Sequence, residues 1–233
     1  MRVKQLVAAM TWCLLCPFTV SAQVLPIQQK YIEEGKINWS WAASAQAVLE
    51  YFYVRKSQVE IGDYGTNGYD VPNFLHGNGD LNRHGVDEIL LRFGGIESRG
   101  YDSPMTPEKV FISVNHFRVP VLIRWARDYG DDSNTGPGDR IVVIKGAEYR
   151  DWTLYLMLMD SVEGTYEKDY NWVVEGAGHI WAESLEIVTE PSNVDESLAE
   201  SDKNMPITGP LLQKKDLQAV LENPDWDGIH HQK

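Results

Sequence analysis

Cysteine is scarce in this sequence: the 233-residue chain has only two, Cys13 and Cys16. Both lie in an apolar stretch that follows a basic start and ends in small residues before Gln23. This pattern is typical of a secretory signal peptide, and a lipoprotein signal ending at Cys16 is the alternative interpretation. Cleavage after residues 1–22 leaves a chain without cysteine, which excludes disulfides and a catalytic thiol.

Long hydrophobic runs and basic residues are also few. No later apolar segment approaches the roughly 20 residues that span a bilayer, so no membrane contact is expected once the signal is cleaved. The 21 Lys and Arg are outnumbered by 34 Asp and Glu, which gives a net charge of −13. Nucleic acid is excluded as a partner because its binding needs a basic surface. The expected location is outside the cytoplasm, either periplasmic or secreted.

The remaining composition is that of a folded protein. Hydrophobic residues make up 43% of the chain and aromatic residues 11%, which is enough to build a core without disulfides. We expect one domain over residues 23–189. Residues 190–233 are rich in acids, Ser and Asn, which predicts a flexible acidic tail. A short amphipathic helix is expected within the tail, over residues 211–221.

The first half of the domain has helical patterns. Residues 41–52 contain no Gly or Pro, and Ser40 before them is expected to be the N-cap of a helix. A second helix is expected over residues 86–93, where it ends at two glycines. A third begins at Thr106, followed by proline at the first helical position. The glycine-rich residues 62–85 are expected to be irregular.

The second half changes to the patterns of strands. Short runs of β-branched and aromatic residues alternate with Gly, Asp and Asn turns. Helices followed by strands favour an α+β fold over an alternating parallel architecture. The expected strands are 119–125, 141–145, 152–159, 171–175 and 179–188.

Two interpretations of Ser40 follow from its position. A hydroxyl at a helix N-terminus can act as a nucleophile or belong to an oxyanion site, because free N–H groups stabilise negative charge there. The alternative is simple capping of the helix. The histidines lack the spacing of metal ligands, and the acidic loop 128–134 does not fit a calcium loop. No metal and no other cofactor is expected.

Several segments, in order along the chain, resemble a known family. Residues 38–49 read Asn-Trp-Ser-Trp-Ala-Ala-Ser-Ala-Gln-Ala-Val-Leu. This run is similar to the nucleophile helix of secreted bacterial papain-like cysteine peptidases, which reads approximately Asn-Trp-Cys-Trp-Ala-Ala-Ser-x-Gln-x-Val-Leu. Residues 138–146 resemble the family's Gly-Gly-His-x-Val-Val-Ile-x-Gly strand, and residues 156–160 resemble the strand that ends in the catalytic acid. The resemblance spans roughly residues 24–188 and implies a papain-like fold with a helical N-terminal lobe and an antiparallel sheet C-terminal lobe.

The resemblance also implies that the catalytic residues are degenerate. It places the nucleophile at Ser40, the general base at Arg140 and the orienting acid at Asp160. Gln29 is the candidate for the oxyanion-hole glutamine, with Gln28 as the alternative. Serine needs a base to become a nucleophile, and an arginine that is always protonated is not a base. Arg140 is instead expected to form a partly buried ion pair with Asp160, through either one or two hydrogen bonds.

A degenerate peptidase of this kind keeps the cleft between its lobes. The resemblance therefore implies an exported pseudopeptidase that binds a peptide or protein partner without cleaving it. Three tryptophans, Trp39, Trp41 and Trp181, are candidates for the lining of that cleft, with the core between the lobes as the alternative.

Two other functions remain open at this point. One is a hydrolase with a rearranged site, in which His116, His179 or another base outside the family pattern activates Ser40. The other is an inhibitory or immunity-type protein whose acidic surface covers a basic target. The sequence leaves the oligomeric state and the identity of the partner open.

Overall fold

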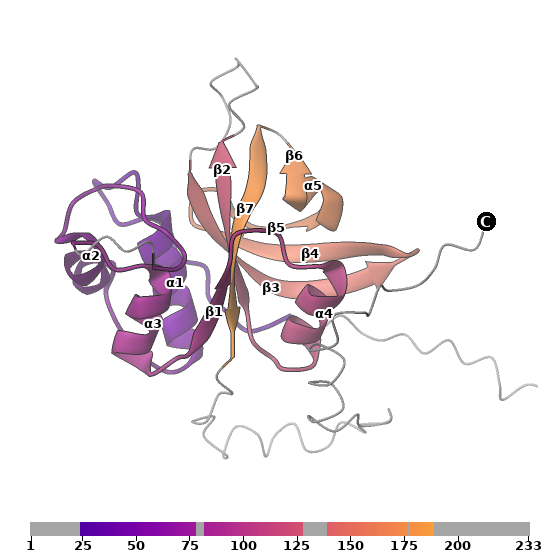
Figure 1. Cartoon of the computed structure of the whole chain (residues 1–233), viewed down its shortest axis with the longest axis horizontal. Coiled ribbons are helices and arrows are strands. Elements are labelled where there is room, and N and C mark those ends of the chain that lie inside the picture. Colours follow the sequence, from indigo (N-terminus) through magenta and orange to yellow (C-terminus); the bar gives the residue numbers. More distant parts are fainter. Residues whose placement is uncertain (1–23, 78–81, 128–138, 177, 189–233) are drawn as a thin grey trace, which may run out of the picture.

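The computed structural model describes residues 24–77, 82–127, 139–176 and 178–188. The expected signal peptide, the acidic tail and the acidic loop 128–134 lie outside these residues. Helices and an antiparallel sheet lie side by side, with α1, α2 and α3 gathered next to the sheet (Figure 1). The α+β class, with a helical lobe followed by an antiparallel sheet lobe, is confirmed.

The helical lobe contains three helices: α1 (Ser40–Tyr51), α2 (Gln58–Thr66) and α3 (Val86–Gly94). Two match the expected helices, and α3 ends at Gly95 in the left-handed conformation. Helix α2 was missed, because its glycines resemble a loop. It begins with a capping box, in which Ser57 and Glu60 each bond to the other's backbone. Irregular structure in this part of the chain therefore begins after Thr66.

The sheet lobe contains two further helices and the strands. Helix α4 (Pro107–Asn115) begins at Thr106, whose side chain caps it as expected. The six-strand path runs β1-β7-β2-β3-β4-β5, and β6 pairs with β7. The strands are β1 (Ser98–Tyr101), β2 (Val121–Arg127), β3 (Arg140–Arg150), β4 (Thr153–Asp160), β5 (Gly164–Asp169), β6 (Glu175–Gly176) and β7 (His179–Ile187).

Most of the strand predictions are confirmed, and one is wrong. The adjacent antiparallel pairing of β3 and β4 is present as expected. The predicted strand at 171–175 is mostly a helix, α5 (Tyr170–Val174), because the Asp169 side chain accepts a bond from the N–H of Trp172 and starts a helical turn. Strands β1 and β5 were not predicted. Both are half-exposed edge strands with polar residues, so neither carries a clear hydrophobic pattern.

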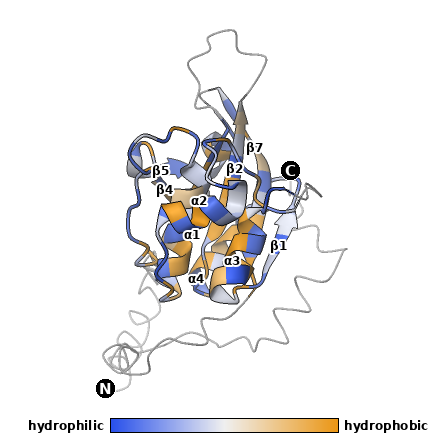
Figure 2. Ribbon diagram, turned by 90° about the vertical axis from the view of Figure 1, so that its left-hand side faces the viewer, coloured by the Kyte–Doolittle hydropathy of each residue, from blue (hydrophilic) through white to orange (hydrophobic). Residues whose placement is uncertain are grey.

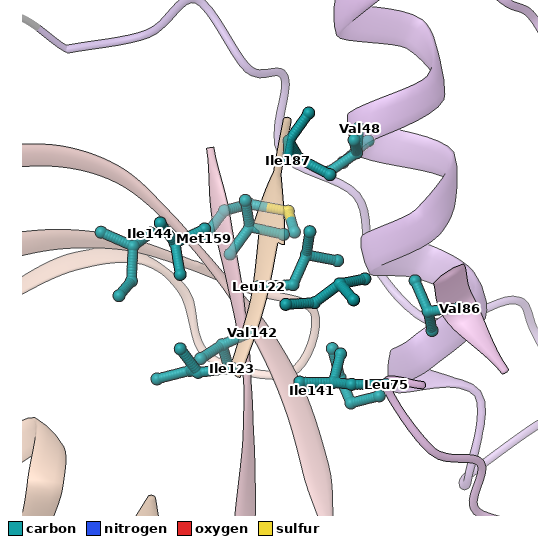
Figure 3. Packing of buried hydrophobic residues seen from close by; sticks show 14 of the residues in the cluster. Val48, Leu75, Val86, Leu122, Ile123, Ile141, Val142, Ile144, Met159 and Ile187 are labelled. Atoms are coloured by element: carbon teal, nitrogen blue, oxygen red, sulfur yellow. The ribbon is translucent and has the colours of Figure 1, made fainter. Parts of the chain in front are cut away.

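The hydrophobic core lies between the sheet and the helices and continues on the other face of the sheet. Seen from the helical side, α1 and α3 lie in front of strands with mostly hydrophobic residues (Figure 2). Leu122 and Ile141 lie on the helical side of the sheet, whereas Ile123 and Val142 lie on the other (Figure 3). The alternation along β2 and β3 thus buries both faces of the central strands.

Candidate functional site

The N-terminus of α1 meets the start of β3 at Ser40. Helix α1 begins at Ser40, but Trp39 occupies the N-cap position and makes no side-chain cap, so the expected capping role of Ser40 is wrong. The Oγ of Ser40 instead accepts a hydrogen bond from the backbone N–H of Ile141, at 3.1 Å, and the residue is buried. The hydroxyl therefore joins the two lobes.

A second serine one turn further along α1 completes this contact. Ser44 Oγ donates to the carbonyl oxygen of Ile141 at 2.9 Å. The N–H and the C=O of one strand residue point to the same side, and the pairing of β3 with β4 begins only at Val143. Ser40 and Ser44 thus take the place of a neighbouring strand at Ile141.

Arg140, the residue before Ile141, pairs with the acid at the end of β4. Its Nη1 lies 2.5 Å from Oδ2 of Asp160, which is fully buried. The same Nη1 lies 3.3 Å from Oε1 of Glu163. The expected ion pair is present, and the contact with Asp160 is made by one guanidinium nitrogen. Arg140 is therefore a cation that is already paired.

The Asp160 carboxylate has its remaining acceptor positions filled as well. Its Oδ1 accepts from the N–H groups of Val162 and Glu163, which makes a side-chain turn after the strand. Its Oδ2 also accepts from the hydroxyl of Tyr166 at 3.2 Å. Burial, with the charge of Asp160, raises the pKa of Tyr166, so this hydroxyl stays protonated and donates.

Gln29 lies beside Asp160 rather than beside Ser40. Its amide Nε2 donates to the carbonyl of Asp160 at 2.7 Å and to that of Lys30 at 3.0 Å. Its Oε1 accepts from the hydroxyl of Thr165. Both amide hydrogens are therefore engaged, and no bond between Gln29 and Ser40 occurs among the described contacts. The geometry gives an oxyanion-hole role no support.

The three tryptophans proposed to line a cleft are in the core. Trp39 and Trp41 pack against Gly62 and Gly65 of α2, where a side chain larger than hydrogen would collide with the rings. Their indole N–H groups donate to backbone carbonyls of the loop after α2. Trp181 is buried and donates to the carbonyl of Glu183. The lining interpretation is wrong, and the core alternative holds.

Neither histidine of the rearranged-hydrolase alternative contacts Ser40 through a described bond. His116 is exposed at the end of α4. His179 is buried between Trp125 and Trp172, and its Nε2 faces the carbonyl oxygen of Trp172 at 3.1 Å. Since a carbonyl only accepts, Nε2 carries the proton. Burial, together with the charge of Arg140, lowers the pKa of His179.

A second arginine beside the site was not singled out from the sequence. Arg124 of β2 lies opposite Ile141 in the sheet. Its Nη2 lies 2.6 Å from Oε1 of Glu183, and its Nη1 lies 3.6 Å from Oδ2 of Asp139. Glu183 also accepts from the N–H of Leu75 in the helical lobe. No local motif marks these contacts, because Arg124 lies on β2, Glu183 on β7 and Asp139 just before β3.

Two exposed apolar side chains are Ile37, just before α1, and Tyr69, just after α2. Their exposed fractions are 80% and 70%. Asp70 fixes both segments, because its carboxylate accepts from the N–H groups of Ile37 and Asn38 while Tyr69 precedes it in the chain. We call these two residues the Ile37–Tyr69 patch. Ile37 precedes Ser40 by three residues in the chain, and the carbonyl of Tyr69 accepts from the indole N–H of Trp39, the residue before Ser40.

The described residues contain neither a cluster suited to a metal ion nor a membrane-spanning helix. No group of three or more His, Cys, Asp or Glu is arranged to hold a metal ion within the described ranges. None of the helices placed by the structure is long and apolar enough to cross a bilayer.

Comparison with known proteins gives structural matches only. No family model matches the sequence, and a search of curated proteins finds no significant match. Among the solved structures that match is a double glycine motif protease from an AMS/PCAT transporter in complex with the leader peptide. It is 19% identical with a TM-score of 0.44, and the match covers 72% of this chain and 97% of that chain.

Two further solved structures match this chain with lower sequence identity. A protein described as a C39-like peptidase from Bacillus anthracis is 11% identical with a TM-score of 0.47, covering 72% of this chain and 98% of that chain. UfSP from C. elegans is 11% identical with a TM-score of 0.42, covering 75% of this chain and 36% of that chain. Values this low carry no conclusion about activity, and the α+β class rests on the helices and sheet described above.

Proposed function

We propose that the chain is an exported, non-catalytic relative of the papain-like peptidases, which binds an extended peptide segment beside Ser40 without cleaving it. The observation that carries the proposal is the pairing of Arg140 with Asp160. The motif resemblance assigns these two residues to the base and the acid of a triad. A guanidinium that is already paired with the acid cannot accept a proton from Ser40.

The contacts of Ser40 support the same proposal. The Ser40 oxygen accepts a hydrogen bond from the N–H of Ile141. This bond draws electron density away from the oxygen, whereas a nucleophile needs high electron density on its attacking atom. A cysteine, the residue of the family motif, is a poorer hydrogen-bond acceptor than serine. Serine at this position therefore suits a structural contact between lobes better than it suits catalysis.

The Ile37–Tyr69 patch is the surface proposed to receive the peptide. Exposed apolar side chains that are held in place by backbone contacts need little ordering on binding. Asp70 provides such support here. The patch belongs to the segments that flank the start of α1, and Ser40 at that start is bonded to Ile141 of β3.

A peptidase assay tests the absence of catalysis. The chain without residues 1–22 is expected to cleave neither casein nor a peptide library. Because it contains no cysteine, inhibitors that react with thiolates are expected to leave it unmodified. Ser40→Cys combined with Arg140→His is expected to recover weak cleavage, whereas each change alone is not, because nucleophile and base act as a unit. Turnover by the unmodified protein that is lost in Ser40→Ala would overturn the proposal.

A binding assay tests the second part. Short fluorescein-labelled peptides that alternate leucine with glutamine are titrated with the full chain, and fluorescence anisotropy is measured. Ile37→Ser with Tyr69→Ser is expected to abolish binding. The matched control is Val59→Ser with Leu91→Ser, which removes exposed apolar side chains on α2 and α3. Equal binding by both double variants would contradict the proposal.

A further inference from the structure

We propose that the start of the acidic tail binds back onto the domain, at the end of α1. The segment concerned, residues 190–202, contains five acids and no lysine or arginine. The surface that receives it consists of Tyr53 and Arg55, just after α1, and Arg118, in the loop after α4. It is distinct from the Ile37–Tyr69 patch of the proposed function, because Ile37 precedes the start of α1 whereas Tyr53 follows its end.

The tail leaves the domain beside this surface. Val188, the last described residue before the tail, donates its N–H to the carbonyl of Glu97 on one side. On the other side of β7, Val121 of β2 lies opposite Glu186 in the antiparallel register. The same register, continued to the last described residue, brings Val119 opposite Val188. The residue next to Val119 is Arg118, so the tail starts close to this arginine.

Arg118 and Tyr53 belong to one surface. The hydroxyl of Tyr51, at the end of α1, donates to the carbonyl of Arg118 at 2.6 Å. Tyr53 and Arg55 follow Tyr51 within four residues, and both are exposed. The exposed fraction of the Tyr53 side chain is 55%. An aromatic ring and two guanidinium groups are therefore available where the tail begins.

Two residues of this surface have a strained backbone. The φ angle is 63° at Tyr53 and 58° at Arg118. This left-handed conformation is unfavourable for a residue with a side chain, and a chain that leaves a helix commonly has glycine there. Side chains that are kept against the preference of the backbone indicate a use for the side chains themselves.

The charge of this surface is opposite to that of the tail. Neither Arg55 nor Arg118 forms an ion pair with another of the described residues. Glu50, in the last turn of α1, is already paired with Lys30 at 2.6 Å. Glu97, beside Val188, has an interaction of its own. Carboxylates of the tail would therefore meet two arginines without a counter-ion.

The tail carries the matching groups within reach. Four of its acids lie between Asp195 and Asp202, and Val194 and Leu198 are the apolar residues beside them. The seven residues from Val188 to Asp195 span up to about 23 Å when extended. A tether this short gives an effective concentration of about the millimolar range, so contacts too weak to hold a separate peptide are enough here.

Hydroxyl-radical footprinting of the chain without residues 1–22 tests the docking. Two other exposed tyrosines, Tyr31 and Tyr69, are internal references for the oxidation of Tyr53. Protection is the readout because exposed ion pairs change the Tm little. The early-tail variant carries Asp195→Asn, Glu196→Gln, Glu200→Gln and Asp202→Asn. Relative to the references, oxidation of Tyr53 is expected to rise about threefold in this variant, the size expected when modest exposed ion pairs are lost.

A matched control separates the docking from the charge of the tail as a whole. The late-tail variant, Asp216→Asn, Glu222→Gln, Asp225→Asn and Asp227→Asn, removes the same charge and is expected to keep Tyr53 protected. Arg55→Glu with Arg118→Glu is expected to expose Tyr53. Lysine in place of the four early acids is expected to restore protection in that background, because the charges are exchanged across the same contact.

Equal oxidation of Tyr53 in the unmodified chain and the early-tail variant would overturn the proposal, as would equal effects of the early-tail and late-tail variants. The two arginines would then serve only the carbonyl ends of their helices. Neither result changes the binding of a peptide at the Ile37–Tyr69 patch, so the proposed function stands or falls by its own assay.

Discussion

Ser40 and Ile141 are joined across the two lobes by a hydrogen bond from the Ile141 N–H to the Ser40 Oγ, at 3.1 Å. The Ser40 hydroxyl thus serves as a hydrogen-bond acceptor for a residue near the start of β3. The hydroxyl of Ser44, by contrast, donates a hydrogen bond to the carbonyl oxygen of Ile141. The two serines therefore play opposite roles at one residue of β3.

Because Ser40 and not Ser44 accepts from the Ile141 N–H, only a change at Ser40 is expected to leave this amide without its hydrogen bond. Ser40→Ala leaves a buried N–H without its partner, which costs about 1–2 kcal/mol of the free energy of unfolding. Hydrogen exchange of the Ile141 amide, followed by NMR, is expected to become faster in Ser40→Ala. In Ser44→Ala the amide keeps its partner, so its exchange is expected to change much less. Equal acceleration in both variants would contradict the assignment.

The Arg140–Asp160 pair predicts a large loss of stability. Arg140→Ala leaves a fully buried carboxylate without its counter-ion, which costs about 3 kcal/mol. The Tm is expected to fall by roughly 5–10 °C. Arg55→Ala, at an exposed position, is the control and is expected to leave Tm almost unchanged.

A second change tests whether the loss comes from the unpaired charge. Asp160→Asn in the Arg140→Ala background removes the buried charge and is expected to recover part of the lost Tm. A double variant less stable than Arg140→Ala alone would show that the carboxylate serves mainly its turn with Val162 and Glu163.

The sequence predicted the parts of this site that depend on local patterns. The start of α1 follows from a run without Gly or Pro. The contact between Arg140 and Asp160 was expected from the motif resemblance, and it forms because β3 begins beside the end of β4 in their antiparallel pairing. The helical start at Asp169 has a local signal too, an acid three residues before an N–H that it caps, but the hydrophobic run after it favoured a strand.

What the sequence did not predict depends on contacts between distant segments. Trp39 and Trp41 are buried because Gly62 and Gly65 leave room for their rings, and a helix with two glycines reads as a loop. The Arg124 group joins β2, β7 and the residue before β3, so no spacing along the chain marks it. Such groups follow from the sheet order and not from any local motif.

His179 predicts a pH dependence of stability. Burial lowers its pKa in the folded state, so the unfolded chain binds the proton more readily. Neutral His179 therefore contributes fully to stability above the ordinary histidine pKa of about 6.5. This contribution is lost as the pH falls below about 6.5 toward the lower pKa that His179 has in the folded state. His179→Gln keeps an N–H for the Trp172 carbonyl and is expected to lose less Tm than the unmodified protein between about pH 7 and pH 5. His116→Gln, at an exposed position, is expected to keep the full dependence. Identical pH profiles for all three proteins would contradict the prediction.

Trp152, at the tip of the β3–β4 hairpin, predicts a substitution that stabilises the fold. It is 98% exposed and has a φ of 66°, next to Asp151 with a φ of 47°. A left-handed conformation destabilises the folded state by about 1–2 kcal/mol at a residue other than glycine. Replacing that residue by glycine removes this strain, but it also makes the unfolded chain more flexible, which lowers the free energy of unfolding by about 0.5–1 kcal/mol. Trp152→Gly is therefore expected to raise the free energy of unfolding by roughly 0.5–1 kcal/mol, measured by urea denaturation. Trp152→Ala removes the same ring but keeps the backbone strain, so it is expected to leave stability almost unchanged. A glycine variant no more stable than the alanine variant would show that the turn is not strained at this residue.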